Sequence, residues 1–527
     1  MWLKDKGYQT LRLNDFWGWI NVRNSNDSID DKQWQIGVNV VSDGNKLNTI
    51  PWYVQYVAPW TWVSRWQAIA LYTWLILVLH NRNLYIYNTT SWVTYTKTNA
   101  VANAVDTYSI LTTKAFSWQI AIVIINNNLL TTEDIVAYEF DWTTFTTKTF
   151  TSLADKNFKC GMFYDWKLLL WGNPKFPSSL YGSKTWLVAL PNNIYDFSAY
   201  DSSAQNVWDG EPIVAILSNH NELFIVKTNS IWRSQWPRDS WADAVSKSYS
   251  YILRQETATW AINSQCVLAV EQDVIYFDWL NLRRLSYETN INALNDDSIS
   301  KEISNLFLDF PSNQSGNATM YFAYPFVKLC IRDKFSTNNS VGILYNIVDK
   351  SYSVQTWIEV VQWVGWFVNN RRTAYFISAQ TSMVFQDNIG YTYNWGNINV
   401  SHKSKRYVLW DWVDYKRISQ VELYWKISPW LESTIDIYVN GDIIDSRKIL
   451  FSDIILPTTG SSNVWDTLLG WNSEGLNNPM RDFVVRYEYF NDGRDLTFWI
   501  RSNGQGKLEL HWLNLMYKNI KAYDIHN

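Results

Sequence analysis

The sequence predicts an all-β protein. Helical periodicity is almost absent, whereas strands of about four to eight residues, rich in Val, Ile, Tyr, Phe and Thr, recur along the chain. Asn, Asp, Gly, Ser or Trp separate these strands, as expected of turn residues. The strands expected most clearly cover residues 75–79, 83–87, 120–125, 222–226 and 274–277. Many short strands at regular spacing are typical of a sandwich, a barrel or a propeller.

The spacing of the strands favours a propeller. A unit of an apolar strand, a short polar turn, a second strand ending in Tyr or Phe, and a further turn and strand recurs near residues 66–98, 114–150, 158–190, 211–236, 262–288, 319–357 and 366–394. The intervals are roughly 40 to 60 residues, the period of four-stranded propeller blades. Because one blade cannot bury both faces alone, blades stack around an axis. We therefore expect a β-propeller of six or seven blades over residues 58–395.

The two ends of the chain differ from this middle part. Residues 396–527 contain strands in which polar and apolar side chains alternate, as in Ile435–Asp442. Alternation predicts one buried and one solvated face, so we expect a separate C-terminal antiparallel β-sandwich. Residues 1–57 combine a polar stretch with short strands. We expect them to form an N-terminal extended arm that contributes strands to the propeller or to a neighbouring molecule.

Glycine and tryptophan occur at unusual levels. The chain has 20 glycines in 527 residues, well below the usual level of about 7%. It has 33 tryptophans, and the two types together make up a tenth of the chain. Tight hairpins favour Asn-Gly or Asp-Gly, because both central residues of a type I′ turn have φ > 0. Asn440-Gly441 fits such a turn, and three Asp-Trp pairs stand in the same setting: Asp141-Trp142, Asp165-Trp166 and Asp278-Trp279.

These turns suggest a hypothesis about the genetic code of the source. A bulky aromatic residue with φ > 0 is a conformational outlier, and three in matching contexts form a pattern. The hypothesis is that the source reads UGA as glycine, so that Trp is written where the organism inserts glycine. The alternative is genuine tryptophan, from a code that reads UGA as Trp or from selection for aromatic residues. All residues keep the names of the printed sequence.

Bulk properties exclude several classes of protein. The net charge is −4, with 45 basic and 49 acidic residues well mixed, unlike the basic footprint of a nucleic-acid-binding domain. No apolar stretch approaches the length of about 18 residues that a transmembrane helix needs. The first residues lack the apolar segment of a signal peptide. The three cysteines, which are far apart, are expected to be free, buried thiols in a reducing cytoplasm.

The sequence offers no clear catalytic site. The five histidines lack metal-ligand spacing, and neither a Gly-x-Ser-x-Gly elbow, a phosphate loop nor a Cys-x-x-Cys pair occurs. Paired carboxylates could serve a glycosidase, and the candidates are Asp141, Asp165, Glu211 and Asp278. Three of them lie in predicted turns, where Asp usually has a structural role. We therefore expect a protein without catalytic residues, metal or cofactor.

The N-terminal residues resemble a known family. Tail hub, nozzle and packaged-DNA stabilisation proteins of short-tailed bacteriophages open with Phe-x-Gly-Gly-Ile/Leu-Asn, then a polar stretch, an Asn-Val-x-x-x-x-Gly strand and a basic-Pro-Gly-Tyr segment. The matching residues, with three of the Trp read as glycine, are Phe16, Trp17, Gly18, Trp19, Ile20, Asn21, then Asn39 and Gly44, then Pro51, Trp52 and Tyr53. The basic residue before the proline is absent here. Residues 168–174, residues 208–213 followed by 223–231, and residues 273–280 resemble blade strands of the same proteins.

The resemblance implies a non-enzymatic structural protein of the virion, a tail hub or nozzle assembled in the host cytoplasm. It would form a ring with itself, expected to be a hexamer, below the portal. The ring would retain packaged DNA and provide its exit channel during genome ejection. Its partners would be the portal or adaptor, other tail proteins and viral DNA passing non-specifically, without membrane insertion.

Two alternatives remain open at this point. A carbohydrate-binding or glycosidase-like propeller acting in receptor binding predicts a cleft with convergent carboxylates and aromatic platforms. A host cell-surface propeller used for adhesion predicts a secretion signal.

Overall fold

The computed structural model describes most of the chain. It covers residues 9–13, 34–43, 46–50, 54–57, 66–91, 93–115, 118–128, 135–153, 156–164, 167–184, 194–198, 205–206, 210–219, 222–235, 250–256, 261–288, 293–308, 310, 318–334, 336, 339–356, 360–368, 371–378, 384–387, 398–404, 406–408, 415–427, 430–449, 481–493, 495–505 and 507–520.

The described residues form an all-β structure in which strands predominate, as the sequence predicts. Between residues 54 and 386 the strands form successive antiparallel groups of four. The first four groups are β6 (Trp66–Tyr72), β7 (Leu75–His80), β8 (Asn83–Asn88), β9 (Thr94–Lys97); β10 (Tyr108–Lys114), β11 (Ile120–Asn126), β12 (Ile135–Phe140), β13 (Phe145–Lys148); β14 (Cys160–Tyr164), β15 (Lys167–Trp171), β16 (Ser179–Gly182), β17 (Gln205–Asn206); and β18 (Ile213–Asn219), β19 (Glu222–Lys227), β20 (Ser230–Gln235), β21 (Ser250–Glu256).

Three further groups follow in the described chain. They are β22 (Val267–Val270), β23 (Asp273–Phe277), β24 (Leu282–Glu288), β25 (Ala293–Ser298); β26 (Thr319–Ala323), β27 (Phe326–Arg332), β28 (Asn339–Asn346), β29 (Tyr352–Thr356); and β30 (Val360–Val368), β31 (Arg371–Ser378), β32 (Val384–Gln386) with β5 (Val54–Val57). Short helical turns η4 (Ser264–Cys266), η5 (Lys301–Ile303) and α1 (Ser304–Phe307) flank the groups that begin with β22 and β26.

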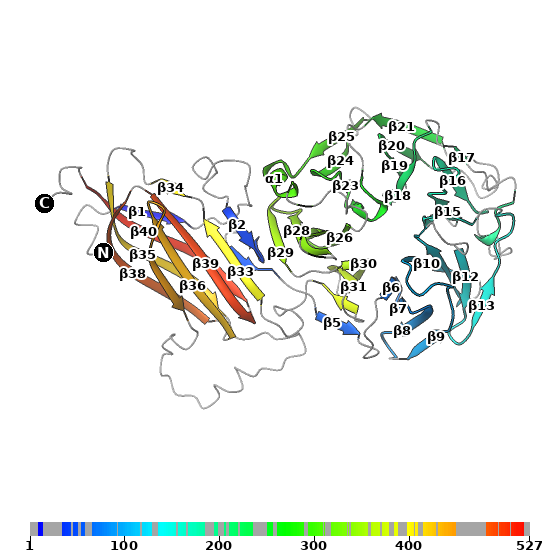
Figure 1. The fold of residues 1–527 in the computed structure, drawn as a ribbon, viewed down its shortest axis with the longest axis horizontal. Helices are drawn as coiled ribbons and strands as arrows, with labels where there is room; N and C mark the ends of the chain where they lie inside the picture. The colour runs from blue at the N-terminus through cyan, green and yellow to red at the C-terminus, as the bar shows by residue number, and fades with distance from the viewer. Residues whose placement is uncertain are drawn as a thin grey trace.

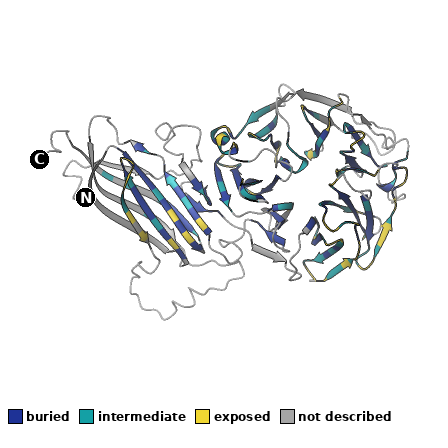
Figure 2. Ribbon diagram, in the orientation of Figure 1, coloured by how far each residue is buried: buried dark blue, intermediate teal, exposed yellow. Residues whose placement is uncertain are grey.

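These groups are arranged in a circle (Figure 1). The first strand of each group contacts the first strand of the next, from β6 through β10, β14, β18, β22 and β26 to β30, and β30 contacts β6 again. Apolar cores fill the spaces between neighbouring groups, and the last space is filled as well, because Ile69 and Ile76 share a core with Tyr375, Ile377 and Val384. Buried residues are accordingly concentrated in the strands (Figure 2). The circle is therefore held by apolar packing at every junction, including the one between its two ends.

The remaining strands form two sheets beside the circle. One sheet has the order β3-β4-β40-β35-β38 with β1 against β40, and the other continues from β29 through β2-β33-β39-β36-β37 with β34 against β39. Their bounds are β1 (Gln9–Leu13), β2 (Trp34–Val38), β3 (Val40–Asp43), β4 (Lys46–Thr49), β33 (Ile398–Ser404), β34 (Tyr407–Val408), β35 (Tyr415–Ile427), β36 (Trp430–Val439), β37 (Asp442–Ile449), β38 (Arg481–Gly493), β39 (Asp495–Gln505) and β40 (Leu508–Ile520). Leu508 and Leu510 of one sheet share a core with Ile435 and Ile500 of the other.

The N-terminal strands connect the circle with the two sheets. The sequence predicts an arm over residues 1–57 that contributes strands to the propeller or a neighbour, and a separate unit over residues 396–527; the structure places strands of both segments in the same sheets. β2 lies between β29 of the circle and β33 of the C-terminal part, and β4 pairs with β40. β5 pairs with β32 and completes the last group of four. Strand pairing over such long sequence separations has no local signal, which is why alternation alone suggested independent units.

The turns that contain Asp-Trp have an unexpected register. Asn440 and Gly441 both have positive φ (51° and 88°), which confirms the turn predicted there. In the two described Asp-Trp turns, however, the Trp is the first central residue: Asp141 N donates to Thr144 O, and Asp278 N donates to Asn281 O. Trp142 and Trp279 have φ of 74° and 86°. In a type II′ turn the first central residue has a positive φ and is usually glycine. The expected type I′ turn instead has a positive φ at both central residues. Asp165-Trp166 lies outside the described residues.

Other tryptophans lie in different settings, and Trp74, in the turn between β6 and β7, is 50% exposed without a positive φ. Trp118, which is 80% exposed, also has a left-handed φ of 73°. Trp171, Trp232 and Trp499 instead lie in strands β15, β20 and β39. The conformations at three turns therefore favour glycine, as the recoding hypothesis expects, while the tryptophans inside strands give no such signal.

Replacing Trp142 or Trp279 with glycine is expected to raise the free energy of unfolding by about 1 kcal/mol each. Relief of a left-handed backbone at a non-glycine residue contributes about 1–3 kcal/mol. Loss of aromatic contacts opposes it by about 0.5–1.5 kcal/mol, since the Trp142 ring lies 6.1 Å from Trp74 and the Trp279 ring 6.3 Å from Phe277. Urea unfolding of the two variants measures the difference.

Trp499→Gly is the matched control for these turn variants. Trp499 lies within β39, and its indole Nε1 donates to Ser401 Oγ at 2.7 Å. Its replacement is expected to lower the free energy of unfolding by more than about 1 kcal/mol. Equal destabilisation by Trp142→Gly and Trp499→Gly would contradict the turn interpretation. Tandem mass spectrometry of a peptide spanning Asp165-Trp166 from the natural source tests the code itself, and a tryptophan mass there would exclude recoding.

Candidate functional site

Of the N-terminal motif residues that carry the family resemblance, the structure describes Asn39. The others, Phe16 to Asn21, Gly44 and Pro51 to Tyr53, lie outside the described residues. Asn39 stands between β2 and β3 with a positive φ of 59° and is fully buried. Asn tolerates the left-handed region better than other residues with a side chain, which explains its suitability for this position.

Asn39 joins three parts of the fold by hydrogen bonds. Its backbone N–H donates to Val354 O at 2.7 Å, and its carbonyl accepts from Ile50 N at 3.0 Å. Its side-chain Oδ1 accepts from Thr356 N at 3.0 Å, while Nδ2 donates to Thr356 Oγ1 at 3.1 Å and to Asn399 O at 2.6 Å. Val354 and Thr356 belong to the circle, whereas Asn399 belongs to the C-terminal sheet. The motif residue is thus the junction between the N-terminal strands, the circle and the C-terminal part.

Two further segments of the resemblance have structural roles. Gly172 follows β15 with a φ of 78°, and a Cβ at this position would lie 3.1 Å from Lys159 Cβ, so only glycine fits without strain. Glu211 accepts hydrogen bonds from Asn229 N at 3.2 Å and from Ser230 Oγ at 3.1 Å. The carboxylate therefore closes the turn between β19 and β20.

The carboxylates considered for catalysis are engaged in turns. Asp141 Oδ1 accepts from Thr144 N at 2.6 Å and from Thr143 N at 3.0 Å. These N–H groups, with the two threonine hydroxyls, hold the pKa of Asp141 well below its usual range. Asp278 accepts from two backbone N–H groups of its turn in the same way. Asp141 and Asp278 are therefore turn residues, Glu211 bonds the turn between β19 and β20, and Asp165 lies outside the described residues.

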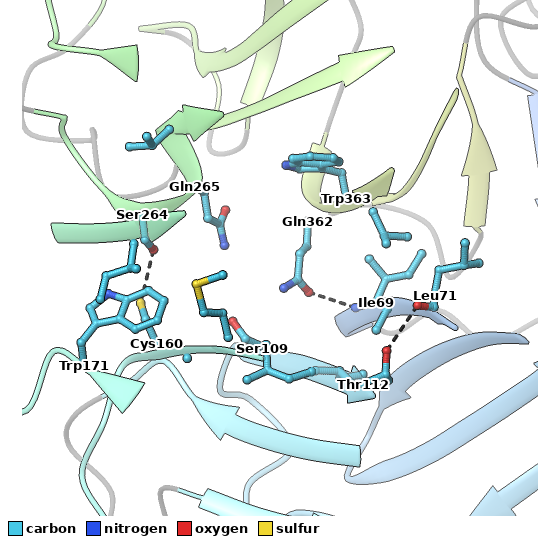
Figure 3. Close-up of a pocket in the computed structure, with 18 residues that line it drawn as sticks. Ile69, Leu71, Ser109, Thr112, Cys160, Trp171, Ser264, Gln265, Gln362 and Trp363 are labelled. Atoms are coloured by element: carbon cyan, nitrogen blue, oxygen red, sulfur yellow. Dashed lines mark hydrogen bonds between the residues drawn. The ribbon is translucent and has the colours of Figure 1, made fainter. Parts of the chain in front are cut away.

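A cavity of about 360 Å³ lies where the inner strands of the circle meet (Figure 3). Its lining comes from β6, β10, β14, β15, β18, β22 and β30 together with η4. The polar side chains that line it are Ser109, Thr112, Cys160, Ser264, Gln265 and Gln362. None of the 18 described lining residues is Asp, Glu, Lys, Arg or His. The cavity is therefore neutral, and sequence reasoning missed it because its residues converge from strands far apart in the chain.

The described residues offer no metal site. Within the described ranges, no group of three or more His, Cys, Asp or Glu side chains could hold a metal ion. The three cysteines are free, with Cys266 and Cys330 buried and Cys160 partly buried at the cavity. Burial raises the pKa of the Cys160 thiol. In the same part of the chain, no helix is both long and apolar enough to span a bilayer.

Comparisons with known proteins do not identify a family. No protein family and no curated protein matches the chain by sequence. Among solved structures, the chain is similar to the computationally designed Ika8 protein at 8% identity, with a TM-score of 0.34, over 64% of this chain and 99% of that one. It is also similar to PorZ, a surface component of the type-IX secretion system of Porphyromonas gingivalis, at 11% identity and a TM-score of 0.36, over 68% of this chain and 43% of PorZ. At such low scores neither likeness bears on fold or function.

Proposed function

We propose that the circle of sheets is a seven-bladed β-propeller closed by an N-terminal strand, with a β-sandwich beside it. Support comes from the contacts that run through the innermost strands and return from β30 to β6. The pairing of β5 with β32 joins the beginning of the propeller segment to its end. Such closure gives every blade two neighbours, so that each can bury both faces.

We further propose that the chain is a non-enzymatic structural protein of a bacteriophage virion, a tail hub or nozzle. The observation that carries this proposal is Asn39. It is a residue of the family-like N-terminal motif, and its side chain bonds both Thr356 of the propeller and Asn399 of the C-terminal part. A protein that must resist the pressure of packaged DNA needs its parts held in a fixed relation, and a buried hydrogen-bonded junction supplies this.

We propose that the genome channel lies between subunits rather than within one propeller, and the small central cavity supports this arrangement. A volume of about 360 Å³ corresponds to roughly a dozen water molecules at ~30 Å³ each. A B-DNA duplex, whose major groove alone is about 12 Å wide, is too large to be held in a cavity of this volume. In the proposed ring, each propeller therefore forms part of the wall, and several copies surround the DNA below the portal.

Cryo-electron microscopy of the particles that contain this chain tests the placement. The expected result is a ring of copies around the tail axis, in contact with portal or adaptor subunits and with a channel between the propellers. Density for the chain away from the tail axis, or its absence from purified particles, would refute the proposal. Light scattering of the purified chain measures its oligomeric state in solution. A mass that corresponds to a ring of several copies supports the proposed assembly.

A further inference from the structure

The cavity contains a hydrogen-bond donor whose orientation is determined by the backbone. Gln362 Oε1 accepts from Ile69 N at 2.9 Å. A backbone N–H can be bonded only by the amide oxygen, so the Gln362 amide nitrogen must point away from Ile69. Figure 3 shows that this nitrogen faces the cavity. Among the described residues no acceptor for it is found, which leaves two N–H donors for a ligand or water.

A second amide lines the cavity from another part of the circle. Gln265 lies in η4, where its backbone N–H donates to the side chain of Asn263 at 2.8 Å. The Asn263 side chain in turn donates to Ala318 O at 3.0 Å, and the Thr319 hydroxyl bonds Gln265 Oε1 at 2.9 Å. Gln265 is thus held at both its backbone and its side chain. The two glutamines project into the same space from different parts of the propeller (Figure 3).

The remaining lining determines which ligand these amides suit. Ser264 and Cys160 lie close together, with Cys160 Sγ 3.4 Å from Ser264 Oγ. The Trp363 ring packs against Tyr321 at 6.0 Å, so its orientation is also restricted. Amides and hydroxyls can donate to and accept from hydroxyl groups, while a charged ligand would find no counter-ion among the described lining residues. The volume of about 360 Å³ lies within the range of pockets that hold small molecules, about 300–1,000 Å³.

We propose that the central cavity binds one small neutral polyol of monosaccharide size, held by hydrogen bonds from Gln265 and Gln362. The apolar side chains between them pack against the carbon skeleton of the ring. This is binding without hydrolysis, because no carboxylate lies among the described lining residues. The inference does not depend on the placement of the chain in a virion, since the cavity belongs to a single chain.

Titration of the full chain with methyl glucoside, methyl galactoside, N-acetylglucosamine and glucuronate, followed by saturation-transfer NMR and calorimetry, tests the proposal. At least one neutral sugar is expected to saturate at one site per chain, and glucuronate is expected to bind at least tenfold more weakly. Failure of every neutral sugar to saturate at up to roughly 10 mM, ten times a millimolar dissociation constant, overturns it. Equal or tighter binding of glucuronate does the same.

Variants at the two amides separate binding from folding. Gln362→Glu keeps the acceptor for Ile69 N–H but removes the donor, so sugar affinity is expected to fall about fivefold or more. Gln265→Glu is a second variant with the same expectation. Gln272→Glu, on the exposed turn between β22 and β23, adds the same charge outside the cavity and should leave affinity unchanged. Equal sugar affinity in all three folded variants would refute the binding site. Ring assembly on the virion is measured in a separate experiment, and its outcome does not affect this test.

Discussion

Asp387→Ala is expected to lower the free energy of unfolding by about 3–5 kcal/mol. Asp387 follows β32, and its two carboxylate oxygens lie 2.9 and 2.8 Å from Lys328 Nζ on β27. Both side chains are fully buried. Lys328 Nζ also lies 3.4 Å from Gln355 Oε1. Removal of the carboxylate leaves a buried ammonium group without its counter-charge, and this is among the most costly changes that a core can undergo.

The position of this ion pair explains why its loss should affect the whole propeller. Lys328 belongs to the group that begins with β26, whereas Asp387 belongs to the group completed by β5. The pair therefore crosses between two neighbouring blades, close to the strand that closes the circle. We expect the urea unfolding transition of the propeller to shift to lower denaturant concentration.

Two controls test whether the loss of stability in Asp387→Ala arises because the remaining charge is buried. Lys448 and Glu432 form an exposed pair at 2.6 Å, and Glu432→Ala is expected to cost no more than about 1 kcal/mol. The double variant Lys328→Met with Asp387→Leu removes both charges and should recover most of the stability that Asp387→Ala loses. A loss of less than about 1 kcal/mol in Asp387→Ala, similar to that of the exposed pair, would show that the pair does not hold the blades together.

The sequence predicts the strands well because their signal is local. Ile120 to Ile125 is an uninterrupted apolar run, and the structure has β11 buried throughout. The Asn440-Gly441 turn was likewise predictable from two residues. Lys328 and Asp387 carry no such signal, because a lysine in a strand is ordinarily a solvated residue. Only the meeting of two blades makes it a buried ion-pair partner.

The candidate sites show the same division. Asn39 could be singled out from the sequence because it stands in a motif, but its partners Thr356 and Asn399 are more than 300 residues away. Gln265 and Gln362 stand in no motif, and their convergence depends on how the inner strands are placed around the axis. The pattern of side chains reports which face of a strand is buried, and it contains no information on which distant strand lies opposite.

Asn39→Ala is expected to lower the free energy of unfolding by about 2–4 kcal/mol. The change leaves Thr356 N and Asn399 O without the side-chain partner that each has now, and a buried polar group left unsatisfied costs about 1–3 kcal/mol. Alanine also adopts a φ of 59° at a cost of about 1–2 kcal/mol. Urea unfolding measures the total loss of unfolding free energy. Hydrogen exchange at β29 and β33 locates the effect, since loss of the junction should raise the exchange rates of both strands.

Three comparisons separate the side chain from the backbone. The Asn39→Gly variant accepts the positive φ but lacks the side-chain hydrogen bonds. The difference in unfolding free energy between the Gly and Ala variants therefore measures the cost of the positive φ. Asn440→Ala removes an exposed Asn with a similar φ of 51° and is expected to cost only about 1 kcal/mol. If Asn39→Ala costs no more than Asn440→Ala, the buried hydrogen bonds contribute nothing and Asn39 is simply a turn residue. If the full loss occurs and exchange rises in both parts, the family-like motif acts as the joint through which propeller and C-terminal sheets are held in one fixed relation.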